Sequence, residues 1–169
     1  QVQLDPAQLV PDSRRDDNTF PAAGPASVVV VQLPPLEMHF VPIIVSTAGN
    51  VTTANLDAYL QTARELLPIG PISATIGQPL ATANSFGTPP NGGASGFWTS
   101  TLAELDLARL MSTRPNAHWY GVVAPPAGFS NVTNGGWAYI PADPASVGAN
   151  TRTALGVNVG WFNAPTQSR

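Results

Sequence analysis

Residues 28–45 read VVVVQLPPLEMHFVPIIV and contain two apolar, largely β-branched runs separated by a proline-containing connector. Each run has the length and composition of a buried strand, and the two prolines favour an extended link. We therefore expect strands at 28–31 and 40–45. The composition also changes sharply before the first run, which predicts a domain boundary near Gly24.

The segment after these strands predicts a helix and then a further strand. Residues 53–67 repeat apolar side chains at the spacing of one helical face, and Thr52 or Thr53 is a suitable cap. Pro68 ends the pattern. Residues 72–78 then alternate in polarity as expected for a strand.

A second helix is expected after a loop. Residues 81–96 are rich in Asn, Gly, Pro, Ser and Thr, and we expect a mobile surface loop there. The second helix is predicted at 100–112, with Thr101 and Glu104 as a capping box and Pro115 after its end. Its expected core contacts are Trp98, Leu102, Leu105 and Leu110.

Three more strands are predicted at 118–124, 136–140 and 153–160, separated by turn signals. Strands that alternate with helices favour parallel crossovers, whereas the closely spaced final strands permit an antiparallel edge. The predicted fold is α/β, with a mixed, mostly parallel twisted sheet, two helices, an antiparallel edge strand and a short β tail.

Composition excludes several function classes. The chain has 169 residues, 10% charged residues, no cysteine and a formal net charge of −3, and all seven basic residues are arginine. The absence of a basic stripe disfavours nucleic-acid binding. No apolar run approaches the ~20 residues that cross a bilayer, so no membrane span is expected.

The chain offers no candidate catalytic or metal-binding residues of its own. The two histidines, His39 and His118, lie far apart in sequence, and we expect structural or surface roles for both. Glu104 and Asp106 lie two residues apart on a helix, on different faces. The acidic run 12–18 is read as a solvated turn, with a calcium site as the less favoured alternative.

Residues 2–6, 9–13 and 16–20 resemble the closing strand and the acidic turn of a CARDB-type immunoglobulin-like adhesion module. The arginine pair Arg14 and Arg15 and the single Asn18 depart from the usual pattern of that turn. This resemblance implies that residues 1–24 are the tail of such a module and its linker.

A second resemblance covers roughly residues 34–164. In sequence and order these segments are similar to the amino-terminal subdomain of secreted metzincin-like zinc peptidases. The family forms a twisted sheet whose antiparallel edge strand lines the substrate cleft, and an H-E-x-x-H helix follows the last strand. The chain lacks that helix motif, so residues 25–169 are expected to form an incomplete subdomain. The segments that carry the resemblance are 40–43, 65–69, 102–110, 119–123, 135–141 and 156–161.

The resemblance implies a substrate-binding edge strand and no catalytic or metal-binding residue in this chain. Free backbone groups on an edge strand bind extended peptides by β-addition. Ordinary packing on a sheet face is the alternative for its aromatic side chains. Zinc is expected only if a further carboxyl-terminal part supplies its ligands. The implied edge strand is Gly136, Trp137, Ala138, Tyr139 and Ile140.

Two functions are consistent with these patterns. The first is the non-catalytic amino-terminal part of an extracellular zinc metallopeptidase-like protein, whose partner is the remainder of the same polypeptide or a companion chain. The alternative is an extracellular structural or adhesion subunit that self-associates through strand edges, because low net charge and unpaired edges favour association. Either one is expected to be secreted or displayed on a cell surface, in a bacterium.

Overall fold

The computed structural model describes residues 2–15, 19–20, 32, 34–66, 70–140 and 152–158. The chain divides into two units, Gln1–Gln32 and Leu33–Arg169. In the first unit, β1 (Val2–Gln3) pairs antiparallel with β2 (Thr19–Phe20). The strand expected at 28–31 lies outside the described residues.

The second unit contains a mixed sheet in the order β10-β11-β8-β3-β4. Its parallel strands are β3 (Leu36–Ile44), β4 (Ile72–Ile76), β8 (His118–Val123) and β11 (Thr153–Val157). The antiparallel strand β10 (Gly136–Ala138) forms one edge beside β11. A two-residue strand, β5 (Leu80–Ala81), pairs with the end of β3 beyond β4. The predicted fold class, with its antiparallel edge strand, is confirmed.

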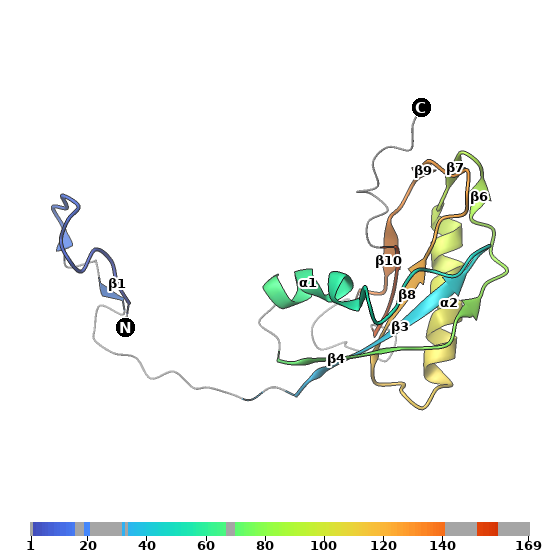
Figure 1. Cartoon of the computed structure of the whole chain (residues 1–169), viewed down its shortest axis with the longest axis horizontal. Coiled ribbons are helices and arrows are strands. Elements are labelled where there is room, and N and C mark those ends of the chain that lie inside the picture. The colour runs from blue at the N-terminus through green and yellow to red at the C-terminus, as the bar shows by residue number, and fades with distance from the viewer. Residues whose placement is uncertain are drawn as a thin grey trace. The chain divides into compact units, whose positions relative to one another are not determined.

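The two helices pack against opposite faces of this sheet. Alternate side chains of a strand point to opposite faces, and β3 accordingly sends Phe40 toward α1 (Leu56–Leu66) and Val41 toward α2 (Ser95–Leu110). Strands β3 and β8 lie between the two helices (Figure 1). Among the described residues, neither helix is both long and apolar enough to cross a lipid bilayer.

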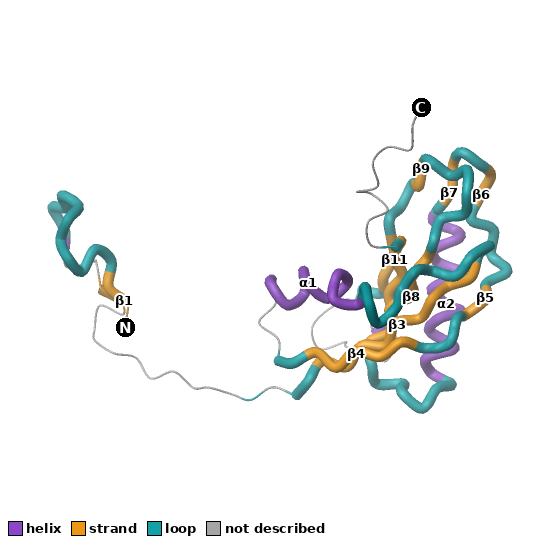
Figure 2. The backbone as a smooth tube through the Cα atoms, in the orientation of Figure 1, coloured by secondary structure: helices purple, strands orange, loops and turns teal. Residues whose placement is uncertain are grey.

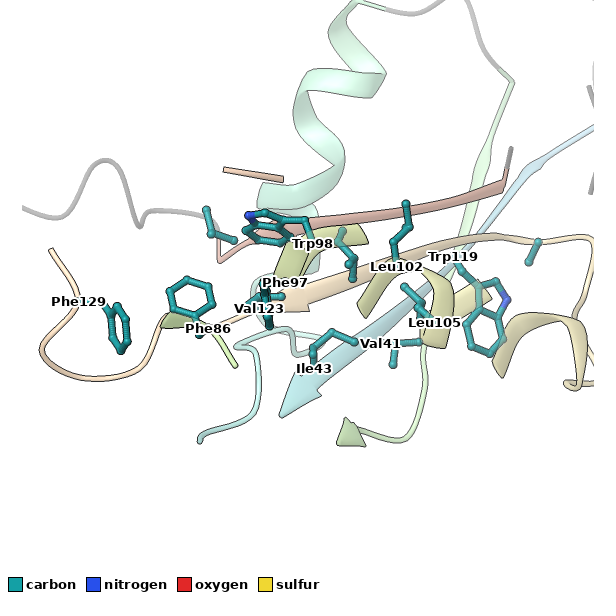
Figure 3. Close-up of a cluster of buried hydrophobic side chains, with 13 residues drawn as sticks. Val41, Ile43, Phe86, Phe97, Trp98, Leu102, Leu105, Trp119, Val123 and Phe129 are labelled. Carbon is teal, nitrogen blue, oxygen red and sulfur yellow. The ribbon is translucent and has the colours of Figure 1, made fainter. Parts of the chain in front are cut away.

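The larger core lies between α2 and the sheet (Figure 3). Trp98, Leu102 and Leu105 repeat at helical spacing and are fully buried against the sheet. The indole N–H of Trp98 donates to the carbonyl of Gly93 at 2.8 Å, which satisfies its one polar group. Gly121 permits this close packing, because a Cβ there would lie 2.2 Å from a Leu155 methyl.

Helix α2 begins earlier than expected, and two of its predicted features are wrong. The helix starts at Ser95, so Thr101 lies in its interior, fully buried, and cannot form the predicted capping box. Leu110 is 47% exposed, because the last buried position on that face is taken by Arg109 instead. The predicted core positions of Trp98, Leu102 and Leu105 are correct.

The prediction of a mobile loop at 81–96 is also wrong in part. It contains the hairpin β6 (Gly87–Thr88) and β7 (Asn91–Gly92), and β7 also pairs in parallel with β9 (Asn131–Val132). Phe86 is buried edge-to-face against Phe97 and Phe129. These aromatic contacts fix a segment whose composition alone is typical of a loop.

Helix α1 and strand β4 are confirmed with shorter bounds than expected. The threonine cap predicted for α1 is not formed. Instead, Asn55 precedes the first helical residue, and its side-chain oxygen accepts the backbone N–H of Thr52 at 2.7 Å. The Tyr59 hydroxyl donates to the carbonyl of Asn50 at 2.8 Å, which secures the turn before the helix.

A buried ion pair within α2 is hydrogen-bonded to Thr153 of β11. Arg109 is 1% exposed, and its Nε donates to Asp106 Oδ1 at 2.9 Å and to Thr153 Oγ1 at 3.1 Å. The Thr153 hydroxyl donates to the same Asp106 oxygen at 2.6 Å. Another guanidinium nitrogen donates to the carbonyl of Pro115. The network neutralises one buried charge with another and ties the helix end to the sheet.

Replacing Asp106 by Asn tests this network. The substitution keeps the side-chain shape but leaves the Arg109 guanidinium buried without a counter-charge, so we expect the free energy of unfolding to fall by about 3–5 kcal/mol. Urea unfolding followed by tryptophan fluorescence measures it. The matched control is Asp57→Asn in the exposed Asp57–Arg64 pair, expected to cost under about 1 kcal/mol. Equal losses of unfolding free energy in the two variants would contradict the stabilising role given to the buried Asp106–Arg109 pair.

Candidate functional site

The candidate site is the free edge of β10. Strand β10 pairs with β11 through Trp137 opposite Leu155 and Ala138 opposite Ala154. The flanking hydrogen bonds come from Tyr139 N–H to the Thr153 carbonyl and from Val157 N–H to the Gly135 carbonyl. The backbone groups of the odd-numbered residues in 135–139 therefore bond to β11.

The even-numbered residues of β10 direct their backbone groups away from the sheet. In an antiparallel ladder the residues of an edge strand alternate between bonding inward and facing outward. The N–H and C=O groups of Gly136 and Ala138 are thus directed to the open side of the strand. Among the described strands, none pairs with that side.

The side chains of this segment divide between the two faces of the sheet. Trp137 lies opposite Leu155 and therefore on the α2 face, whereas Gly136 and Ala138 lie on the α1 face. Trp137 and Tyr139 are 38% and 37% exposed, and Ile140 is 85% exposed. The regular strand ends at Ala138, although Tyr139 still bonds to β11. The edge thus combines outward backbone groups with exposed apolar side chains.

A shallow pocket of about 160 Å³ adjoins this edge. Its lining residues belong to four neighbouring strands and the segments beside them, and the register explains why they meet. Ala138 lies opposite Ala154, which is in register with Tyr120, and His118 precedes Tyr120 by two residues on the same face. The residues that concern the site are His118, Tyr120, Ala138, Tyr139, Arg152 and Ala154.

The absence of a side chain at Gly156 leaves space for the Tyr120 ring on this face of the sheet. Gly156 lies below the Tyr120 ring, and a Cβ on that glycine would lie 1.9 Å from the phenol oxygen. Burial is the main cause that raises the pKa of Tyr120 above its usual value, and Tyr59 adds to it. Arg152 donates to the carbonyl of Asn116 at 2.6 Å, which fixes a cation at the pocket.

The two histidines lie on opposite faces of the sheet. His118 is in register with Met38, so His39, the next residue on β3, points the other way. His39 packs against the Trp119 ring with centroids 4.4 Å apart, and its Nδ1 lies 2.8 Å from the Thr75 hydroxyl. They cannot share a metal ion, and the described residues contain no group of three side chains able to bind one.

The sequence pattern did not identify His118, Tyr120 and Arg152 as neighbours of the edge strand. The period-two alternation within 118–124 and within 153–160 places His118 with Tyr120, but the register between strands is needed to bring them to Ala138.

No family model, curated protein or solved structure matches the chain.

The stability of this site depends on pH through His118. Burial first, and then Arg152 and Arg109, hold the pKa of His118 below its usual value. The unfolded chain therefore binds a proton more readily, and lowering the pH through the unfolded value of about 6.5 destabilises the fold until the lower folded value is passed.

We expect His118→Gln to reduce the loss of unfolding free energy between pH 7.5 and pH 5.5, since glutamine cannot take up the proton. Urea unfolding at a series of pH values measures this slope, and Arg64→Gln, a change at an exposed residue of α1, is the control. A slope unchanged by His118→Gln would show that the histidine does not titrate as described.

Proposed function

We propose that the chain is the non-catalytic amino-terminal part of an extracellular zinc metallopeptidase-like protein, and that it binds an extended polypeptide along β10. The observation that carries this proposal is the outward direction of the backbone groups of Gly136 and Ala138 on an antiparallel edge strand. An added peptide strand pairs with such groups regardless of its sequence, and adjacent pockets select its side chains.

The arrangement of the sheet supports the proposal. Strand β10 is the antiparallel terminal strand and lies beside β11, which is the last of the described strands in chain order. The metzincin-like resemblance implies this kind of edge strand at the substrate cleft. It also implies a metal-binding H-E-x-x-H helix after the last strand of the family's sheet, and residues 1–169 contain no such motif.

In this proposal the described residues bind the peptide and carry out no catalytic step. His39 and His118 point to opposite faces, and no other described side chains form a metal-ligand set. In this proposal the zinc ligands come from a further carboxyl-terminal part, because residues 158–169 contain no His, Cys, Asp or Glu. The described residues orient the substrate by backbone pairing at Gly136 and Ala138, and the pocket near Ala138 receives a side chain of the peptide.

The alternative function, a self-assembling extracellular subunit, is supported by a different part of the sheet. Strand β4 is the opposite edge, and its exposed backbone groups are also unpaired among the described strands. Bound zinc and proteolysis that a chelator stops, measured on the complete polypeptide, favour the peptidase. Polymers that survive chelation favour the subunit.

Peptide binding at β10 is tested with a pair of edge prolines. Ala138→Pro removes the outward N–H, which β11 does not use, so the sheet is retained while the added strand is blocked. We expect it to weaken binding of short fluorescent peptides about ten-fold or more in anisotropy measurements. The matched control, Ala74→Pro on the opposite edge β4, is expected to bind like the unchanged protein.

The amide signals of Gly136 and Ala138 locate the bound peptide independently. In ¹⁵N spectra of the full chain these two signals should shift on titration with a binding peptide, whereas those of Ala74 and Ile76 should not. Binding that survives Ala138→Pro, or peptide shifts confined to β4, would contradict the proposed site.

A further inference from the structure

Strand β4, whose outer edge pairs with no described strand, has a nearly palindromic sequence. Its five residues are Ile72, Ser73, Ala74, Thr75 and Ile76, so isoleucine lies at each end, a hydroxyl residue at each second position and alanine at the centre. A two-fold axis through Ala74 would place isoleucine opposite isoleucine and serine opposite threonine. Any two-fold interface places residue i opposite j and j opposite i, and in β4 the residues paired in this way are alike in size and polarity.

The hydrogen bonds of β4 leave the matching backbone groups available. Leu36 N–H donates to the Pro71 carbonyl, and Gly77 N–H donates to the Phe40 carbonyl. Alternate residues of a strand bond to the same side. The groups of Ile72, Ala74 and Ile76 therefore face away from β3, and no described strand pairs with them.

We infer that β4 pairs antiparallel with β4 of a second copy of this chain, about a two-fold axis at Ala74. Ile72 would lie opposite the partner's Ile76, and Ala74 opposite the partner's Ala74, as hydrogen-bonded pairs that make about six backbone bonds. Ser73 and the partner's Thr75 would face each other at the intervening positions, where hydroxyl pairs are favourable.

The side chains around the edge are compatible with this partner. Strand β4 has no charged residue, proline or bulge, the features that usually protect an edge. Ile72, Ala74 and Ile76 are half-buried and pack against the α1-side cluster around Phe40, so the pairing would continue that apolar layer into the second copy. Figure 2 shows β4 along the outer side of β3.

The charges beside the edge do not oppose the pairing. On the other face, Glu37 lies opposite Ser73 and His39 opposite Thr75 within one chain. The two-fold axis aligns Glu37 of one copy with the partner's His39 and keeps the two glutamates apart. Pro71 and Pro79 flank the strand and limit the length of the pairing. The two-fold axis closes the contact as a dimer, because both copies use the same edge.

The inference is independent of peptide binding at β10, and the same two proline variants separate them. Sedimentation velocity of the full chain, from low-micromolar to near-millimolar concentration, should show a monomer–dimer equilibrium. Ala74→Pro should weaken dimerisation about ten-fold or more, because it removes an outward N–H at the axis, whereas Ala138→Pro should leave it unchanged. A chain that stays monomeric throughout, or an Ala74→Pro variant that dimerises normally, would overturn the inference.

A cysteine cross-link gives a second test that does not depend on the proline variant folding. The chain has no cysteine, so Ala74→Cys introduces a single thiol. Paired residues at the axis lie about 5.5 Å apart between Cα atoms, within the range of a disulfide. Mild oxidation should convert Ala74→Cys to a covalent dimer and leave the control Ala138→Cys monomeric. Cross-linking of the control instead would place the interface on β10 and refute the one at β4.

Discussion

The parallel pairing of β3 with strands on both of its sides is the constraint on which the body of the protein depends. Both backbone edges of β3 are bonded, to β4 and β5 on one side and to β8 on the other. Its side chains must then be buried on both faces, and its apolar residues Phe40, Val41 and Ile43 meet that demand. Each face requires its own helix, which α1 and α2 provide.

The same strand order leaves two unlike edges. Chain reversal between β10 and β11 makes one edge antiparallel, with small residues on the α1 face and the pocket beside it. The crossover through α1 makes the other edge a parallel strand that is symmetric in sequence. One edge therefore has a neighbouring pocket, and the other has a nearly symmetric sequence. This difference is why we assign different partners to them.

Local patterns predict much of this fold, and the errors arise where distant contacts decide. Apolar periodicity is sufficient to predict α1, β4 and β8 from the sequence. The start of α2 at Ser95 is missed because Ser95 and Gly96 are weak helix formers, and burial of Phe97 and Trp98 outweighs that preference. The edge strand at 136–140 follows from turn spacing, but its pocket depends on register between strands. The metzincin-like and CARDB-type resemblances stay predictions.

The sheet separates two cores that share no buried residue: the cluster that includes Phe40 and Leu60 on the α1 side, and the cluster that includes Trp98 and Leu105 on the α2 side. The sheet backbone lies between the two clusters, so substitutions in one should combine additively with substitutions in the other. Evolution can therefore remodel the layer beneath α1, next to both edges, while the aromatic layer beneath α2 preserves the scaffold.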